Sequence, residues 1–344
     1  MIKNNFIIIK PHHSWGFLFM GEGWVDFDMV KRIIPLLWLI SGSSVMGIDR
    51  VKTEAVGEQI YMVTAPPAAL NLDPFYKKYI SAKGYPIISS EKVSDYALYE
   101  ATYLVNMMLA QRKDVRQAMI NSGSRLIVMS YKEMTTDVPE HSQLIPAAYW
   151  DRRARGLGGS ETDPVCSCAE ENLLAFPGDP YHKENILIHE FAHNIHLRGV
   201  IRVDETFDSR LETAYKSAME KGLWAGAYGS SNHHEYFAEG VQSWFDNNRE
   251  NDNDHNHVNT RKELIEYDPV LADLCKEVFG DTKLVYVKPT MRKVLGHLEG
   301  YDFSKSPKFE WPEGLEAGYE DAKPKEEKER LERLKRAREA QENQ

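Results

Sequence analysis

The sequence predicts an α+β fold with a mixed β-sheet and a buried helix that carries titratable side chains. Two short runs rich in branched residues indicate strands, and a long apolar pattern with helical spacing lies between them. The third observation is "ILIHEFAHNIH" (186–196), where two histidines and a glutamate interrupt an apolar stretch. Such residues in apolar surroundings need partners, so this helix is the first place to look for chemistry.

The first half of the principal domain predicts a strand–helix–strand unit. The segments "EQIYMVTAP" (58–66) and "SRLIVMS" (124–130) read as short strands. Between them, Ser94 is a candidate N-cap for a helix over 95–119, whose apolar residues recur at spacings of three and four. Residues 134–141 have the composition of a loop.

The second half predicts mostly helices around the histidine-bearing segment. Residues 152–178 look irregular, with "EENLLAF" (170–176) as a short strand candidate inside them. Asp179 and Pro180 form a helix-start signal, since Asp caps helices and Pro suits a first turn. Two further helices are predicted, at about 206–222 and 232–247.

The chain of 344 residues is divided by this pattern into three parts. Residues 1–47 are predicted to be a leader, and 48–320 the principal domain, with an N-terminal α/β part. Residues 321–344 are almost all charged and predict a helical or disordered tail. The formal net charge of −10 argues against a nucleic-acid partner that binds through bulk electrostatics.

Residues 29–47, "MVKRIIPLLWLISGSSVMG", have the layout of a secretory signal peptide. Lys31 and Arg32 precede an apolar run that is too short to span a bilayer comfortably, and small residues then lead to a cleavage site after Gly47. Residues 1–28 show no assignable pattern, which a start codon placed too far upstream would explain. The expected location is therefore secreted or periplasmic, with no membrane span in the mature chain.

The three cysteines, Cys166, Cys168 and Cys275, are too few for a dense disulfide framework. The Cys166–x–Cys168 spacing does not match a zinc ribbon. One disulfide from Cys275 to Cys166 or Cys168 is compatible with an oxidising compartment, and three unpaired apolar side chains are the alternative.

His189, Glu190 and His193 form an H-E-x-x-H motif. On a helix the two histidines share one face, one turn apart, where two neutral imidazoles can bind one zinc ion. Glu190 lies on the neighbouring face, within reach of a water molecule on that metal. A buried helix whose histidines have ordinary partners is the alternative. His196 lies a further turn along and has no assigned role.

A catalytic zinc site needs a third protein ligand, and two downstream carboxylates compete for that place. Glu235 and Glu239 lie one turn apart in "YGSSNHHEYFAEGVQSWF" (228–245), after the candidate cap Asn232. One can bind zinc while the other accepts the second ring N–H of a ligand histidine. Glu212 has the spacing of a large class of zinc aminopeptidases. His233 and His234 are weaker candidates because they lie at the helix start.

"HEFAHNIH" followed by "YGSSNHHEYFAEG" resembles the catalytic domain of the anthrax lethal factor group of zinc metallopeptidases. The resemblance covers roughly 185–247 and implies a zincin-like fold. It departs in "DRRARGLGGSETDPVCSC" (151–168), so substrate choice does not transfer. Position by position, the resemblance implies these roles: zinc ligands His189, His193 and Glu235, general base Glu190, transition-state stabiliser Tyr228, and a supporting Glu239 behind the ligands.

The expected function is a secreted zinc metallopeptidase that hydrolyses peptide bonds by a zinc-activated water, with Glu190 as general base and a peptide or protein as substrate. Residues 170–176 are expected to pair with the substrate as an edge strand. Arg152, Arg153 and Arg155 are either structural or a site for an acidic substrate group.

Two other function classes stay open. One is a zinc aminopeptidase or cell-wall amide hydrolase, with Glu212 as third ligand and "EEN" (170–172) as anchor for the substrate amine. The other is a zinc-stabilised binding protein without turnover. The presence of Glu190 argues against the latter, because a purely structural site needs no base.

Overall fold

A computed structural model of the chain describes residues 17–20, 23–26, 53–54, 59–282 and 284–342. The chain divides into two compact units, 1–50 and 51–344. In the first unit, β1 (Phe17–Met20) and β2 (Gly23–Asp26) form an antiparallel hairpin. The predicted signal peptide, 29–47, lies outside the described residues and stays a prediction.

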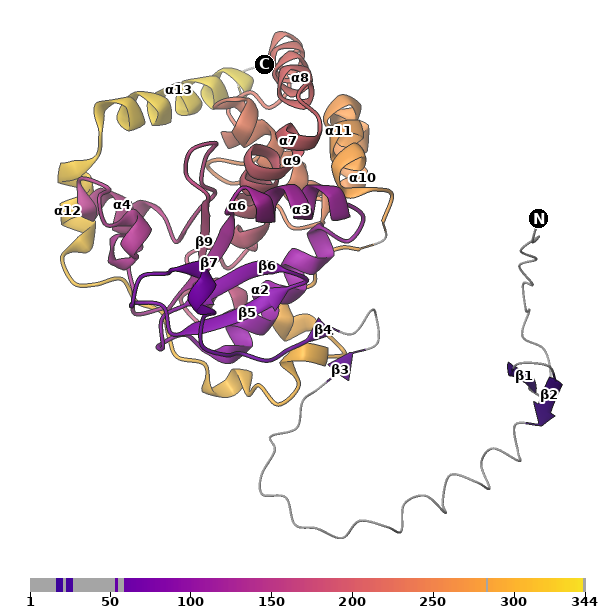
Figure 1. Ribbon diagram of the computed structural model, residues 1–344. Coiled ribbons are helices and arrows are strands. Elements are labelled where there is room, and N and C mark those ends of the chain that lie inside the picture. The colour runs from indigo at the N-terminus through magenta and orange to yellow at the C-terminus, as the bar shows by residue number, and fades with distance from the viewer. Residues whose placement is uncertain (1–16, 21–22, 27–52, 55–58, 283, 343–344) are drawn as a thin grey trace. The chain divides into compact units, whose positions relative to one another are not determined.

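The second unit contains a mixed five-stranded sheet in the order β5-β6-β7-β9-β8, with helices around it (Figure 1). Strands β6, β7 and β9 are parallel, whereas β5 and β8 run antiparallel at the two edges. The predicted α+β class with a mixed sheet is confirmed. The strands are β5 (Lys78–Ala82), β6 (Tyr85–Ser89), β7 (Arg125–Met129), β8 (Gly156–Leu157) and β9 (Val165–Ala169).

The described α-helices of this unit are α2 (Asp95–Met108), α3 (Lys113–Asn121), α4 (Ala147–Arg153), α5 (Glu170–Leu173), α6 (Ile186–Ile195), α7 (Ile201–Val203), α8 (Phe207–Glu220), α9 (His233–Trp244), α10 (Arg261–Tyr267), α11 (Pro269–Phe279), α12 (Leu315–Ala322) and α13 (Lys325–Glu342). A π-helical turn, His196–Val200, continues α6. No described helix has the length and apolar character that crossing a membrane requires.

Successive side chains of β7 point to opposite faces of the sheet, and they are buried on both. Leu126 and Val128 join the main core, which also contains α2, α6 and α9. Ile127 and Met129 join a smaller cluster on the other face, with residues such as Tyr76. This alternation is the period of a strand, and it explains why the predicted strand 124–130 is confirmed as β7.

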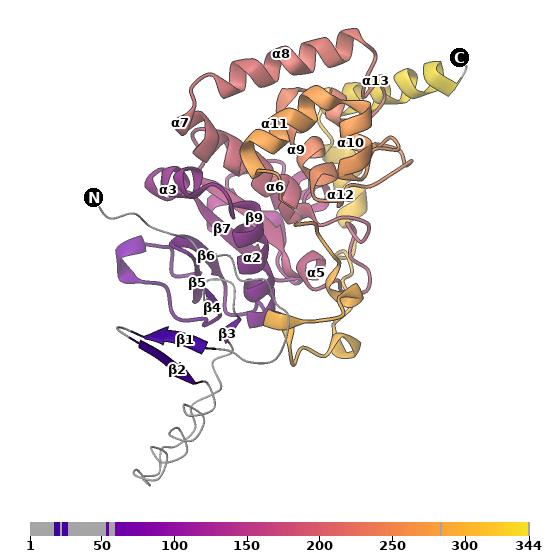
Figure 2. The ribbon, with the colours of Figure 1, turned by 90° about the vertical axis from the view of Figure 1, so that its right-hand side faces the viewer.

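The predicted helix 95–119 is wrong as a single element, because the chain breaks at residues 109–112 into α2 and α3 (Figure 2). Arg112 leaves the helical region, with φ −122° and ψ 73°. The break lets α3 pack on the π-helical turn after α6, where a Cβ at Gly199 would lie 2.6 Å from Val115 Cγ1. Tertiary packing, rather than a local breaker residue, ends the first helix.

The strand predicted at 170–176 is also wrong, since this segment forms the short helix α5 directly after β9. Its two glutamate side chains are buried and contact other segments of the same chain. Glu170 accepts hydrogen bonds from the backbone N–H groups of Ser94 and Tyr131, and buried Glu171 pairs with Arg155. An apolar run in a buried turn therefore has the same sequence appearance as a short strand.

The strand predicted at 58–66 is largely wrong. Only β4 (Gln59–Ile60), paired with β3 (Thr53–Glu54), and a single bridge from Thr64 to Tyr79 fall in or beside it. The hairpin of β5 and β6 was not predicted. Residues 134–141, predicted to be a loop, contain two short 3₁₀ turns.

The histidine-bearing helix α6 begins at Ile186, later than the predicted start. Asn185 is its cap, with its side-chain oxygen accepting from Leu187 N at 3.1 Å. Asp179 instead accepts from Tyr181 N and from the Asn172 amide, which folds the preceding loop. The helices predicted at 206–222 and 232–247 are confirmed as α8 and α9.

The three cysteines are free and buried. Cys166 and Cys168 lie on β9 and Cys275 lies in α11, all within the main core. They act as small apolar residues, so the structure contains no disulfide between Cys275 and either partner considered above.

Candidate active site

Helices α6 and α9 pack together and bring His189, His193 and Glu235 to one point. His189 Nε2 lies 3.0 Å from Glu235 Oε2 and 3.2 Å from His193 Nε2. His193 Nε2 lies 3.2 Å from the same Glu235 oxygen. Ligands at about 2.0–2.1 Å from a tetrahedral zinc ion are about 3.3 Å apart, so the three atoms already have the spacing of one face of such a site.

This donor set fits a zinc ion chemically as well as geometrically. Two imidazole nitrogens and one carboxylate oxygen are the three protein ligands of a common catalytic zinc site, which keeps a fourth position open. The two Nε2 atoms and Glu235 Oε2 point toward one another, as three ligands of one shared cation would. His189, His193 and Glu235 are therefore the residues that would hold the metal.

Gln242 fixes the orientation of His189. The His189 Nδ1–H donates to Gln242 Oε1 at 2.8 Å, and the Gln242 amide nitrogen donates to Glu184 Oε2 at 2.6 Å. With its proton on Nδ1, the ring presents the Nε2 lone pair to the metal position. The sequence offered a signal for Gln242, which lies seven residues after Glu235 and therefore on the same face of α9.

Glu239 lies next to the same nitrogen but is not its hydrogen-bond partner. Its Oε1 is 3.6 Å from His189 Nδ1, while its Oε2 accepts from the Asn248 amide at 2.9 Å and lies 3.5 Å from His255 Nε2. Glu239 therefore contributes negative charge behind His189, and Gln242 makes the contact that Glu239 was expected to make.

A closed ring of polar contacts supports this side of the site. His255 pairs with Asp252 at 2.8 Å, and Asp252 pairs with Arg249 at 3.3 Å. Arg249 in turn pairs with Glu184 at 3.0 Å, and Glu184 accepts the hydrogen bond from Gln242 described above. These loop residues come from the segment after α9 and were missed by sequence reasoning. Their contacts give each buried charge a partner, as a low-dielectric interior requires.

Carboxylates dominate the electrostatics of the site. Burial by itself lowers the pKa of His189, but the hydrogen bond to Glu235 and the nearby carboxylates raise it to about 10. Burial opposes the charge of Glu235, yet His193 and His189 lower the pKa of Glu235 well below its usual value. The surroundings therefore favour positive charge at this position, whether a proton or a metal ion.

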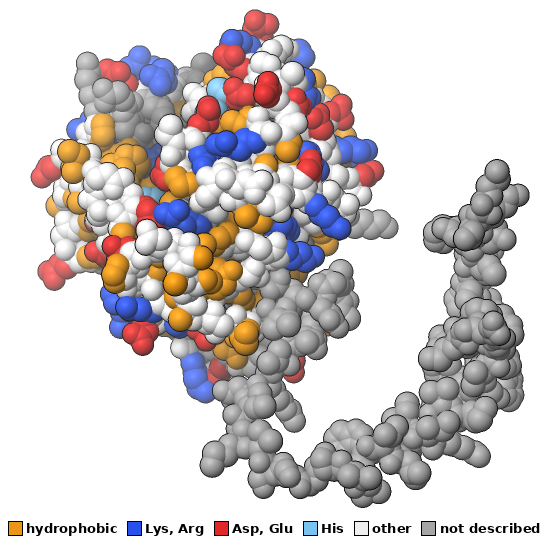
Figure 3. Space-filling model, viewed as in Figure 1, with side chains coloured by type: hydrophobic (Ala, Val, Ile, Leu, Met, Phe, Trp, Pro, Cys, Tyr) orange, Lys and Arg blue, Asp and Glu red, His pale blue; other side chains and the backbone are white. Residues whose placement is uncertain are grey.

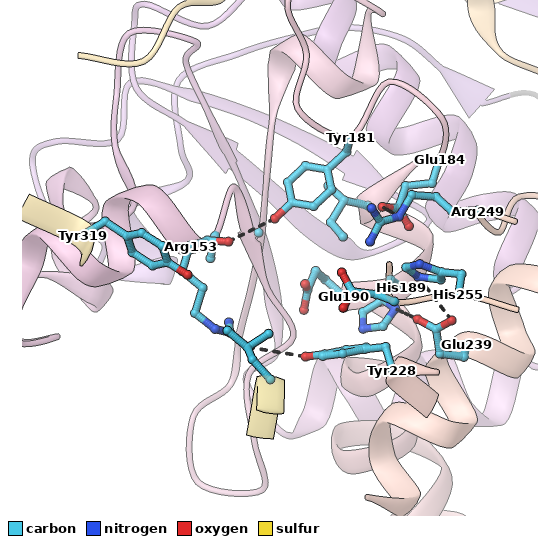
Figure 4. A pocket seen from close by; sticks show the side chains of 15 residues that line it. Arg153, Tyr181, Glu184, His189, Glu190, Tyr228, Glu239, Arg249, His255 and Tyr319 are labelled. Atoms are coloured by element: carbon cyan, nitrogen blue, oxygen red, sulfur yellow. Dashed lines mark hydrogen bonds and ion pairs between the residues drawn. The ribbon is translucent and has the colours of Figure 1, made fainter. Parts of the chain in front are cut away.

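Glu190 and Tyr228 face the cavity beside His189 (Figure 4). Desolvation raises the pKa of Glu190 above its ordinary value, which suits a proton acceptor. Tyr228 opens a short 3₁₀ turn before α9, and its hydroxyl donates to Glu235 Oε1 at 3.1 Å. The structure thus brings together every residue that the resemblance implied.

Two cavities meet at these residues. One, of about 240 Å³, extends toward Tyr181, Arg249 and His255, and the other, of about 730 Å³, extends along β8 toward His234. Both are lined by a common group: Arg153, His189, Glu190 and Tyr228. The two cavities therefore adjoin each other at the residues of the candidate site.

The edge strand β8 forms one wall of the site. A Cβ added to Gly158, directly after β8, would lie 2.5 Å from His193 Cβ, and one added to Gly156 would lie 3.0 Å from Glu190 Cγ. The glycines therefore allow the strand to approach the helix at van der Waals distance. The segment "GLGG", which has no place in the lethal factor pattern, is the edge beside the metal ligands.

The three arginines that precede this edge have different roles. Arg155 is buried and bridges Glu171 to backbone carbonyls, and Arg152 pairs with Glu316 over the Trp311 ring. Arg153 alone of the three lines both cavities, 3.4 Å from the Tyr228 hydroxyl. It supplies a positive charge to the site.

The C-terminal helices reach the same cavities. Tyr319 of α12 and Leu331 of α13 line the smaller one, while Pro324 and Arg333 line the larger. The tail that the sequence marked as charged therefore borders the candidate active site. Acidic and basic side chains are interspersed over the face shown in Figure 3.

Two alternatives from the sequence are contradicted by the geometry. Glu212 lies on α8 and pairs with Lys216 at 2.8 Å, with 47% of its side chain exposed, and it is not in the metal group. The segment 170–172, considered as an anchor for a substrate amine, is buried and lines neither of the two cavities. The aminopeptidase-like assignment thus loses both its ligand and its anchor.

Comparison with known proteins adds little to this geometry. No family model matches the chain, and no curated protein matches it. One solved structure, the Pro-Pro endopeptidase PPEP-2 from Paenibacillus alvei, is similar at a TM-score of 0.38 and 16% identity. The match covers 56% of this chain and 97% of that chain. A likeness at this TM-score does not establish a shared fold, so function must be inferred from the site itself.

Proposed function

We propose that this chain is a zinc-dependent endopeptidase with a zincin-like catalytic domain. The observation that carries the proposal is the convergence of His189, His193 and Glu235 with Glu190 at the junction of two cavities. The resemblance of "HEFAHNIH" and "EYFAE" to the lethal factor group agrees with it. Two adjoining cavities at Glu190 offer more space than one terminal residue needs, which favours cleavage within a chain.

The reaction is hydrolysis of a peptide bond. A zinc ion held by His189, His193 and Glu235 would act as a Lewis acid and lower the pKa of bound water to roughly 7. Glu190 takes a proton from the attacking water and delivers it to the leaving amine, a role that its raised pKa supports. Gln242 keeps His189 in the tautomer that this arrangement needs.

Tyr228 and Arg153 are the groups placed to stabilise negative charge on the carbonyl oxygen. The Tyr228 hydroxyl can turn from Glu235 to that oxygen, and Arg153 lies 3.4 Å behind the hydroxyl. Preorganised donors of this kind are worth more in a water-poor site than in solution. The smaller cavity and the larger one would receive the two halves of the substrate.

The substrate would bind in an extended form along β8. This strand replaces 170–176 as the proposed edge for main-chain pairing, because it lies at the end of the sheet and lines the larger cavity through Leu157. Gly156 and Gly158 let this strand lie directly against Glu190 and His193, so a peptide paired with it would pass close to both residues.

The experiment combines metal analysis with cleavage profiling on a mixed peptide library. The purified chain should contain zinc and make internal cuts, and the Glu190→Gln variant should keep zinc and make none. Trimming from the N-terminus alone would indicate an aminopeptidase, and bound zinc without any cut would indicate a binding protein. An active chain that contains no metal and resists chelators would overturn the proposal.

We also propose export of this peptidase, on the basis of residues 29–47. The test is N-terminal sequencing of the protein recovered from its host. A chain beginning near residue 48 is expected, and a product that retains Trp38 inside the cell would contradict it.

A further inference from the structure

A second group of metal-ligating side chains lies beside the candidate active site and shares no residue with it. His196, Asp208 and His234 each place one ligand atom within 4.8 Å of the others. They come from three elements: the π-helical turn after α6, the first turn of α8, and the first turn of α9. His196 Nε2 and Asp208 Oδ1 are 3.1 Å apart, which matches the roughly 3.3 Å between two ligands of a tetrahedral zinc ion.

The imidazole of His196 lacks the hydrogen bonds that its burial requires. The residue is fully buried, yet neither of its ring nitrogens has a hydrogen-bond partner among the described residues. The Asp208 oxygen is near Nε2 but does not meet the geometry of a hydrogen bond. A buried polar group left in this way calls for an unseen ligand, and a metal ion is one explanation that its neighbours support.

His234, on α9, resembles His196 in this respect. Its Nδ1 is also buried without a hydrogen-bond partner among the described residues. His233, its neighbour, brings a third imidazole within 3.2 Å of Asp208 Oδ1. The rings of Phe207 and Phe237 lie 5.5 Å from the His196 ring and exclude water from it.

Burial and neighbouring groups shift the pKa values of all three side chains. Burial lowers the pKa of His196, and burial with the neighbouring histidines lowers the pKa of His234 to about 4. The close contact with His196 and the charge of the nearby histidines lower the pKa of Asp208 to about 2. Independently of these shifts, the three ligand atoms lie within 4.8 Å of one another, which is the observation that a shared metal ion would explain.

We propose that His196, Asp208 and His234 bind a second zinc ion, separate from the one assigned to His189, His193 and Glu235. Nitrogen and carboxylate donors in this number suit zinc, and the partly exposed Asp208 leaves a path for the ion to enter. Because Glu190 lies at the other group, the second ion has a structural role.

The second ion would tie α8 to the two helices that carry the first site. His196 follows His193 by less than one turn, and His234 directly precedes Glu235, so one metal would hold both ends of the first ligand set. Loss of the second ion should therefore loosen the start of α9 and lower the melting temperature.

The test is zinc stoichiometry after dialysis, measured by mass spectrometry on the full chain and on matched variants. Wild type should bind two equivalents, Asp208→Asn one, Glu235→Gln one, and the double variant none. Glu212→Gln, a carboxylate one turn further along the same helix and paired with Lys216, is the control and should keep two. Circular dichroism checks that each variant is folded.

The outcomes separate this proposal from the proposed function. If wild type binds one equivalent that Asp208→Asn loses and Glu235→Gln keeps, the second site stands and the first fails. If Asp208→Asn binds as much zinc as wild type, the second site is overturned. Should Asp208→Asn fail to fold, His234→Gln, which removes the ligand that α9 contributes, decides between the same outcomes.

Discussion

The two histidine clusters use similar ligands in different surroundings. At His189, the nitrogen that points away from the cluster donates to Gln242, and a ring of polar side chains continues behind it. At His196, neither ring nitrogen has a described hydrogen-bond partner, and phenylalanine rings form the walls. The first cluster is oriented by hydrogen bonds and opens to two cavities with a base beside it. The difference indicates that neighbours, rather than ligand identity, separate a site for chemistry from a site for stability.

Removing the base should have the largest effect and should leave both clusters intact. Glu190→Gln keeps the size of the side chain but cannot accept a proton. Peptide hydrolysis should fall by about 10²–10⁴-fold, since that is the usual worth of general acid–base catalysis. Zinc content and melting temperature should match wild type. A variant that loses zinc as well would show that Glu190 helps to hold the first cluster.

Tyr228→Phe should distinguish charge stabilisation from metal binding at the first cluster. The variant loses the hydrogen bond to Glu235 and the donor proposed for the carbonyl oxygen. Loss of one such donor typically lowers kcat by about 10²–10³-fold, and KM and zinc content should change little. Steady-state kinetics on a fluorogenic peptide gives the answer. An unchanged kcat would remove Tyr228 from the proposed mechanism.

Gln242→Met should weaken zinc binding at the first cluster without affecting the second. It preserves length and leaves His189 Nδ1 without its acceptor, a loss that costs about 10–100-fold in metal affinity or activity. Ser243→Ala is a matched control, since the Ser243 hydroxyl donates to the backbone carbonyls of Glu239 and Val258 and accepts from the Asn248 amide. Competition with a zinc chelator measures the affinity. Equal losses in the two variants would mean that α9 is simply disturbed.

The smallest effect is expected from a change at the start of α9, which should act on both clusters. Asn232 caps α9 by accepting from His234 N and Glu235 N, and these two residues belong to different clusters. Asn232→Ala should cost about 1 kcal/mol of stability and reduce zinc affinity at both sites by a few-fold. Thermal melting with and without zinc tests this. A loss confined to one cluster would show that the clusters are independent.

The parts of the site that were predictable lie on single helices. The spacing of His189 and His193 fixes their common face, and Asn232 marks the start of the helix that carries Glu235, so local pattern sufficed. Gln242 lies on that same face and was overlooked. His255 and Arg249 had no local signal, because a loop brings them to Glu239 and Glu184.

The sheet was harder to predict than the helices for physical reasons. Strand β8 has two residues, one of them Gly156, which is too short for an alternating pattern to appear. The apolar run at 170–176 belongs to a buried turn, and its burial gave it the appearance of a strand. His196 was left without a role because its partner Asp208 lies on another helix, and only the folded chain joins them.

The shortness of β8 has a consequence for how long a substrate would stay. An edge of two residues, Gly156 and Leu157, offers a peptide few main-chain hydrogen bonds, each worth about 0.5–1.5 kcal/mol net. Gly158 and Gly159 beyond it add backbone but no side chain to grip the ligand. Residence times should therefore be short, and both product fragments should leave quickly after cleavage. Turnover in such an enzyme would be limited by bond cleavage rather than by product release.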